Sequence, residues 1–126
     1  MNTPWLVRVI VGNMTKIERW ALAIMEFEGW SKGSVSYRNN NPGNLKWPRT
    51  RKDEYGHTIF TTFHQGWDRL VYQLEMATDG RSGVYYPEMD FYQFFEKYAE
   101  ANSKEYAEFV AKRLEISPMT KIKHLK

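Results

Sequence analysis

Two glutamates, Glu26 and Glu28, lie at the end of a segment with helical periodicity, just before Gly29. A carboxyl group can protonate a leaving oxygen only if it holds its proton near neutral pH, and burial on an apolar surface raises its pKa in that direction. With about 100° of rotation per helical residue, Glu28 falls on the apolar side defined by Ile17 and Glu26 on the opposite side. We therefore expect Glu28 to be a candidate general acid and Glu26 to be a solvated surface charge.

A purely structural interpretation of Glu28 is also open. The helix could end one residue early and leave the carboxylate on a solvated rim, or Arg38 could neutralise it in a structural ion pair. Either arrangement would keep the carboxyl group ionised, with no proton to donate.

The segment after this helix, residues 38–45, reads RNNNPGNL and is rich in amide side chains. Asparagine amides donate and accept hydrogen bonds without charge, which suits the hydroxyl and N-acetyl groups of sugars. The rings of Trp30, Tyr37 and Trp47 flank the segment, and the flat faces of sugars commonly rest on aromatic rings. The alternative is that these asparagines are present because asparagine suits turns.

Two capping boxes predict where helices begin. Thr15 and Glu18 open a helix that should end at Gly29 in a left-handed cap, and Asp90 and Gln93 open another. Apolar spacing predicts two more helices, over residues 67–80 and 106–114. Ser117-Pro118 is a start signal for a last short turn.

Strand character appears in residues 44–47 and 57–63, and the basic segment 48–56 would form the tip of a β-hairpin. Residues 29–43 read as a long irregular loop, which is uncommon in a small domain unless it is functional. We expect an α+β, mainly α, single domain over residues 1–126, with four or more helices and one small hairpin over a cleft. Residues 1–14 form an N-terminal arm, in which residues 4–11 are an edge strand or a packed segment.

Composition excludes several classes of site. The 126 residues include no cysteine, so disulfides and thiolate metal sites are absent. The three histidines have no pair at helical ligand spacing, and we expect neither a metal nor a cofactor. The apolar run at residues 5–11 is too short to span a bilayer or to act as an ordinary signal peptide.

The order of several short segments resembles phage and prophage muralytic enzymes of the lysozyme-like, lytic-transglycosylase-like group. These segments are FEGW at 27–30, SYRNNNPGNL at 36–45, FTTF at 60–63, GW at 66–67 and KYA at 97–99. NNPGNL is the most specific of them, and the resemblance runs from about Ile17 to the C-terminus. It implies a lysozyme-like fold, Glu28 as the catalytic acid and Tyr98 as a tyrosine of the glycan cleft. The candidate substrate-binding residues are Tyr37, Arg38, Asn39, Asn40, Asn41, Asn44, Trp47 and Tyr98.

Glycosidases usually need a second carboxylate, as nucleophile or as base for a water molecule. Asp53 and Glu54 are the only acids between Glu28 and the predicted second helix, and they first suggest a solvated turn. We therefore expect a lytic transglycosylase, in which Glu28 acts as acid and then as base and leaves a 1,6-anhydromuramyl end. If Asp53 or Glu54 instead held a water molecule, the protein would be a hydrolytic muramidase.

Two rival functions need no catalysis. A wall-binding or virion structural protein would keep the cleft without activity, and Arg49, Arg51 and Lys52 suggest a basic nucleic-acid-binding tip. The net charge of +3 suits an acidic partner of any kind. We expect a monomer that binds peptidoglycan strands, not nucleic acid, without stable insertion in a membrane. By resemblance it is phage- or prophage-encoded and acts on the cell wall from the host cytoplasm or from a virion.

Overall fold

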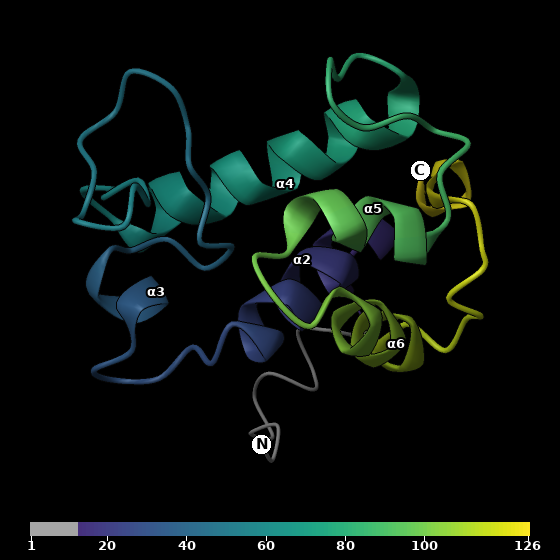
Figure 1. Ribbon diagram of the computed structural model, residues 1–126, viewed down its shortest axis with the longest axis horizontal. Helices are drawn as coiled ribbons and strands as arrows, with labels where there is room; N and C mark the ends of the chain where they lie inside the picture. Colours follow the sequence, from purple (N-terminus) through teal and green to yellow (C-terminus); the bar gives the residue numbers. More distant parts are fainter. Residues whose placement is uncertain (1–12) are drawn as a thin grey trace.

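The computed structural model describes residues 13–126, and the expected edge strand or packed arm at residues 4–11 lies outside them. Helices dominate the described chain, as predicted (Figure 1). They are α2 (Lys16–Phe27), α3 (Val35–Arg38), α4 (Phe63–Asp79), α5 (Phe91–Tyr98), α6 (Ser103–Arg113) and the 3₁₀ helix η1 (Ile122–Leu125).

Both predicted capping boxes are confirmed. In α2 the Glu18 amide donates to the Thr15 hydroxyl over 3.1 Å, and the Thr15 amide donates to the Glu18 carboxylate over 3.0 Å. Asp90 and Gln93 make the same reciprocal pair at the start of α5. Gly29 follows α2 with a φ of 74°, the left-handed conformation that its missing side chain permits.

Two helices begin at positions that differ from the prediction. α4 begins at Phe63, one turn before Trp67, because the Thr62 hydroxyl caps it by accepting a hydrogen bond from the Gln65 amide over 3.2 Å. The last helical turn begins at Ile122, beyond the Ser117-Pro118 turn. The segment expected to be irregular also contains the four-residue helix α3.

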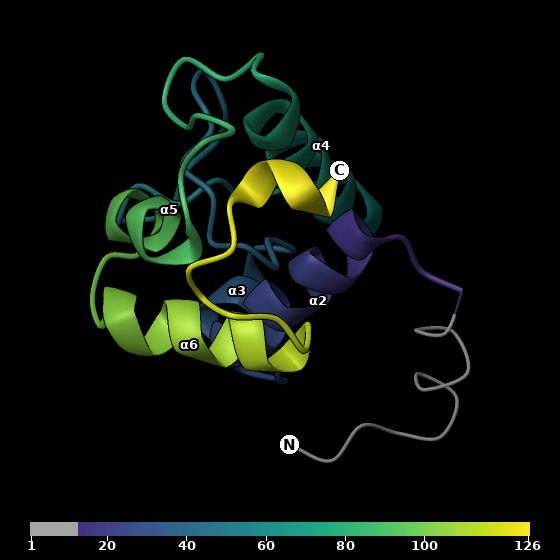
Figure 2. The ribbon, with the colours of Figure 1, turned by 90° about the vertical axis from the view of Figure 1, so that its right-hand side faces the viewer.

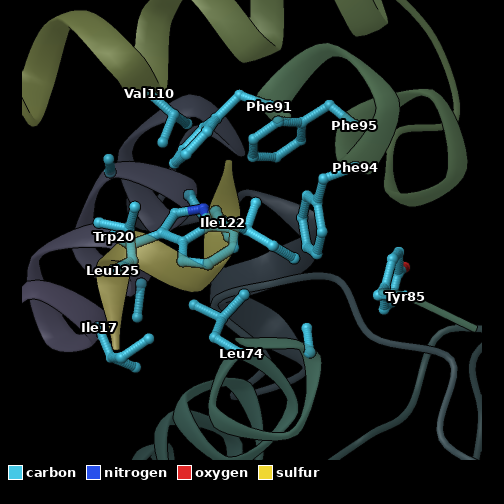
Figure 3. Packing of buried hydrophobic residues seen from close by; sticks show 14 of the residues in the cluster. Ile17, Trp20, Leu74, Tyr85, Phe91, Phe94, Phe95, Val110, Ile122 and Leu125 are labelled. Atoms are coloured by element: carbon cyan, nitrogen blue, oxygen red, sulfur yellow. The ribbon is translucent and has the colours of Figure 1, made fainter. Parts of the chain in front are cut away.

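The core forms around α2, which packs against α4 on one side and against α6 on another (Figures 1 and 2). Trp20 of α2 is fully buried, with its ring 5.1 Å from that of Phe91 and 4.9 Å from that of Phe94. Ile122 and Leu125 of η1 close the same cluster near the C-terminus (Figure 3). Burial of these aromatic and aliphatic groups is the main force that holds the helices together.

The predicted β-hairpin does not form as two paired strands, and the described residues contain no sheet. The loop between α3 and α4, residues 39–62, turns back on itself with one isolated antiparallel bridge, Lys52 to Thr58. A buried side chain takes the place of a strand ladder: the Asn41 amide donates to the Leu45 and Thr58 carbonyls, at 2.9 Å each. The Leu45 amide donates back to the Asn41 side-chain oxygen over 2.9 Å.

Gly66, in the first turn of α4, contacts the backbone of the 39–62 loop so closely that a Cβ atom there would collide with the Asn40 carbonyl. We expect Gly66→Ala to push the loop and helix apart and to lower the free energy of unfolding by roughly 1–3 kcal/mol, as overpacking does. Gly83→Ala is the matched control, because a Cβ atom at that position would have no other atom within 4 Å. Thermal unfolding of both variants tests this, and equal melting temperatures would contradict the close contact.

Candidate active site

Glu28 lies at the C-terminal end of α2, as predicted, where its backbone amide donates to the Ile24 carbonyl over 2.9 Å. Its carboxylate turns toward the 39–62 loop on one side and α6 on the other. Asn44 donates its side-chain amide to Oε1 over 2.7 Å, and the Tyr106 hydroxyl donates to Oε2 over 2.7 Å. Three distant parts of the chain therefore meet at one carboxyl group.

The surroundings of Glu28 favour its protonated form. Burial is the largest influence and raises its pKa above the ordinary value, and the negative charge of Glu100 acts in the same direction. The hydrogen bonds from Tyr106 and Asn44, together with the charge of His57, oppose this rise without cancelling it. Glu28 is thus suited to hold a proton at a pH where an exposed glutamate has lost it.

A cavity of about 310 Å³ opens in front of the Glu28 carboxylate. Its walls come from α2, the 39–62 loop, the end of α5 and the start of α6. The lining residues are Phe27, Glu28, Val35, Gly43, Asn44, His57, Tyr98, Glu100, Ala101 and Tyr106. The cavity is therefore lined by carboxyl, imidazole, amide and phenol groups. Such a lining suits acid and base chemistry on a polar ligand.

Glu100, between α5 and α6, is a second carboxylate on this cavity that sequence reasoning missed. Its Oε1 lies 2.8 Å from Nε2 of His57 and 3.2 Å from Nζ of Lys46. The hydrogen bond from His57 is the main cause that lowers the pKa of Glu100 below its ordinary value. The sequence assigns no role to His57, because no local pattern links it to Glu100, which lies 43 positions away.

Asp53 supports His57 from the other side. Its Oδ2 lies 3.3 Å from Nδ1 of His57 and accepts a hydrogen bond from Asn39 over 2.8 Å. Its Oδ1 accepts from the backbone amides of Tyr55 and His57, at 2.9 Å each. Burial disfavours the charge of Asp53, but these hydrogen bonds together outweigh it and lower its pKa to about 2. Asp53 is therefore a fixed anion of the loop and not the solvated turn residue that the sequence suggested.

Three predicted binding residues lie at the cavities. Asn44 and Tyr98 line the Glu28 cavity, and the Tyr98 hydroxyl donates to the Gly43 carbonyl over 2.6 Å. The same two residues and Trp47 line a larger neighbouring cavity of about 500 Å³, to which Glu100 also contributes. The side-chain oxygen of Asn44 is buried and has no hydrogen-bond partner within the described chain.

The other predicted binding residues do not line the Glu28 cavity. Asn39, Asn40 and Asn41 use their side-chain amides within the fold, on Asp53, on the carbonyls of residues 60 and 61, and on those of residues 45 and 58. Tyr37 and Arg38 are exposed on α3. For these five residues a role in glycan binding stays a prediction.

The expectation that Glu26 is a solvated surface charge is wrong. Its side chain is only 9% exposed, and its carboxylate accepts a hydrogen bond from Arg113 of α6 over 3.1 Å. The reason is that α6 covers the face of α2 opposite the predicted apolar stripe. No ion pair among residues 13–126 joins Arg38 to Glu28, so the alternative of a structural pair at Glu28 finds no support.

Tyr106→Phe tests how far the Tyr106 hydroxyl lowers the pKa of Glu28. The hydroxyl stabilises the carboxylate, so its loss should raise the Glu28 pKa further. An activity that needs protonated Glu28 is lost as pH rises through that pKa, and the alkaline limb of its pH profile should therefore move to higher pH. If the protein releases soluble fragments from peptidoglycan, as its sequence leads us to expect, the pH profile of that release measures this. Tyr92→Phe is the control, because the Tyr92 hydroxyl contacts Glu108 instead, and identical limbs for the two variants would contradict the assignment.

No cluster of three or more histidine, aspartate or glutamate side chains in residues 13–126 is arranged to hold a metal ion. Among the helices of the same range, none combines the length and the apolar character needed to cross a bilayer.

Comparisons of the chain with known protein families, with curated proteins and with solved structures give no match. The chemistry of this site must therefore be inferred from its own residues.

Proposed function

We propose that this protein cleaves the glycan strand of bacterial peptidoglycan, at the β-1,4 bond between N-acetylmuramic acid and N-acetylglucosamine, with Glu28 as the proton donor. The observation that carries the proposal is a half-buried carboxyl group with a raised pKa that faces a cavity lined by polar groups. The NNPGNL resemblance supports the choice of substrate, and with it a lysozyme-like arrangement in which the first helix ends at the catalytic acid.

The hydrogen bonds of Glu28 suit a proton donor. When the proton moves to the glycosidic oxygen, negative charge appears on the carboxylate, to which Asn44 and Tyr106 already donate at 2.7 Å. These donors interact more strongly with the charged carboxylate than with the neutral acid, so they stabilise the transition state more than the bound substrate. They need no rearrangement as the charge develops.

The two neighbouring cavities provide room for a chain of sugars. Volumes of about 310 and 500 Å³ are in the range of ordinary ligand sites, and Asn44, Tyr98 and Glu100 belong to the walls of both. A strand that crosses from one cavity to the other would pass Glu28. Lys46, Lys97 and Arg81 along the larger cavity add positive charge that suits the carboxylates of peptidoglycan.

Two fates are open to the sugar cation that forms when the bond breaks. In lytic transglycosylation the muramyl 6-hydroxyl attacks, and Glu28 accepts its proton to give a 1,6-anhydro end. In hydrolysis a water molecule attacks and a reducing end forms. The sequence favours the first route because it offers one recognisable acid and because it resembles lytic transglycosylases, and Glu100 on the cavity removes the first of these reasons.

Mass spectrometry of soluble muropeptides, released from purified peptidoglycan by the whole protein, tests the proposal. We expect disaccharide-containing fragments that accumulate with time. Binding to insoluble peptidoglycan without release of any fragment would identify a non-catalytic wall-binding protein and overturn the proposal.

A further inference from the structure

The imidazole of His57 contacts the carboxylate of Asp53 on one side and that of Glu100 on the other. Glu100, at one end of this row of three side chains, lines the Glu28 cavity. We propose that Glu100 is the second reacting carboxylate, that it holds the attacking water molecule against the sugar, and that His57 and Asp53 are positioning residues for it. The inference rests on the proposed function and deepens it, since it makes the reaction a hydrolysis.

The geometry leaves one oxygen of Glu100 available. Both His57 and Lys46 contact Oε1, at 2.8 and 3.2 Å, and no hydrogen bond or ion pair from residues 13–126 reaches Oε2. The Glu100 side chain is 59% exposed, so water reaches it freely. An oriented carboxylate with one fixed and one free oxygen is what a water-binding base requires.

His57 is held so firmly that it can orient Glu100. Its side chain is 8% exposed and lies between two carboxylates, with Nδ1 3.3 Å from Asp53 and Nε2 2.8 Å from Glu100. Asp53, with a pKa of about 2, stays ionised and accepts from Nδ1. The 2.8 Å contact between Nε2 and Oε1 of Glu100 then holds the Glu100 carboxylate at the cavity rim.

The surroundings of Glu28 and Glu100 shift the pKa values of these two carboxyl groups in opposite directions. Burial raises the pKa of Glu28, whereas the hydrogen bond from His57 lowers that of Glu100. Two carboxyl groups whose surroundings separate their pKa values in this way suit one acid and one base. The titratable groups that face Glu100 are His57, Lys46 and Glu28. His57 and Lys46 favour the ionised form of Glu100, whereas burial favours the neutral form of Glu28.

The bond from the muramyl C1 to the glycosidic oxygen breaks, and the Glu28 proton passes to that oxygen. The oxygen of the water molecule bonds to C1, and one of its protons passes to Glu100. Glu100 then returns this proton to solvent and Glu28 takes one up, so that one water molecule is consumed for each bond broken.

Glu100→Gln is the first test, with muropeptides from purified peptidoglycan analysed by mass spectrometry. We expect reducing-end products to fall about 10²-fold or more, the usual effect of a lost acid or base group. Anhydro ends, which need only Glu28, should persist and dominate. His57→Gln should lower the ratio of reducing to anhydro ends in the same direction but by a smaller factor, a change that general loss of structure would not produce.

Glu54→Gln is the matched control, because Glu54 is an exposed glutamate next to Asp53 that does not line the Glu28 cavity. It should leave the product ratio unchanged. Thermal unfolding shows that each variant is folded, and sodium azide added to Glu100→Ala should give glycosyl azide, since a small anion can occupy the place of the water molecule.

The possible results separate the inference from the proposed function. Release of only anhydro ends by the wild type, or an unchanged product ratio in Glu100→Gln, would overturn the role of Glu100 and leave glycan cleavage by Glu28 intact. A wild type that releases nothing would overturn both.

Discussion

Glu28→Gln is expected to abolish the release of muropeptides, by a factor above the roughly 10² to 10⁴ that is typical of a lost acid or base group. Glutamine preserves the shape of the side chain and can still accept a hydrogen bond from Asn44, but it has no proton to give to the glycosidic oxygen. No other carboxyl group of the described chain combines burial in this cavity with a raised pKa. Quantitative mass spectrometry of released fragments measures the loss.

The same variant should keep the fold. A neutral amide is easier to bury than a carboxyl group that must ionise, so the free energy of unfolding should stay unchanged or rise by roughly 1–2 kcal/mol. Glu54→Gln is again the control. Glu26→Gln is unsuitable, because it would disturb the contact with Arg113. If Glu28→Gln and Glu54→Gln released fragments equally, with both shown to be folded by their melting temperatures, Glu28 would be a structural residue.

Asn41→Ala should have the largest effect on stability. The side chain is fully buried and makes three hydrogen bonds with the backbone of the 39–62 loop. Its removal leaves the Thr58 carbonyl without this donor and the Leu45 amide without its acceptor, whereas the Leu45 carbonyl keeps the Thr58 amide as a donor. The cost is about 1–3 kcal/mol for each buried group left without a partner. We expect a loss of roughly 3 kcal/mol or more, a large part of the 5–15 kcal/mol usual for a domain.

Urea unfolding followed by tryptophan fluorescence measures this loss. Glu54→Ala, an exposed truncation in the same loop, provides the comparison and should change the free energy of unfolding by less than about 0.5 kcal/mol. Similar unfolding midpoints for the two variants would mean that Asn41 does not hold the loop together.

Local signals in the sequence were sufficient for the starts of α2 and α5. The capping boxes at Thr15 and Asp90 act through neighbouring backbone amides, so their pattern is readable without the fold. The Thr62 to Gln65 spacing is a similar signal, and it could have placed the start of α4 correctly. The position of Glu28 followed from periodicity in the same way.

The errors arose where the partner of a residue is distant in sequence. A single apolar stripe on α2 could not reveal that α6 covers the opposite face, so Glu26 was placed in solvent. The strand-like pattern of residues 44–47 and 57–63 did not reveal that the buried side chain of Asn41 bridges the two segments, beside the backbone hydrogen bond from the Thr58 amide to the Leu45 carbonyl. Glu100 approaches His57 only because the start of α6 and the 39–62 loop meet at one cavity.

The side-chain amides that bond within the 39–62 loop reduce the conformational entropy that this loop would lose when a ligand binds. A loop that orders only when a ligand arrives subtracts its lost conformational entropy from the binding free energy. Here Asn39, Asn40 and Asn41 already fix the chain through bonds within the protein, so that entropy is lost once, during folding. The wall that holds Asn44 against Glu28 is preorganised, and a ligand would meet it in its final shape.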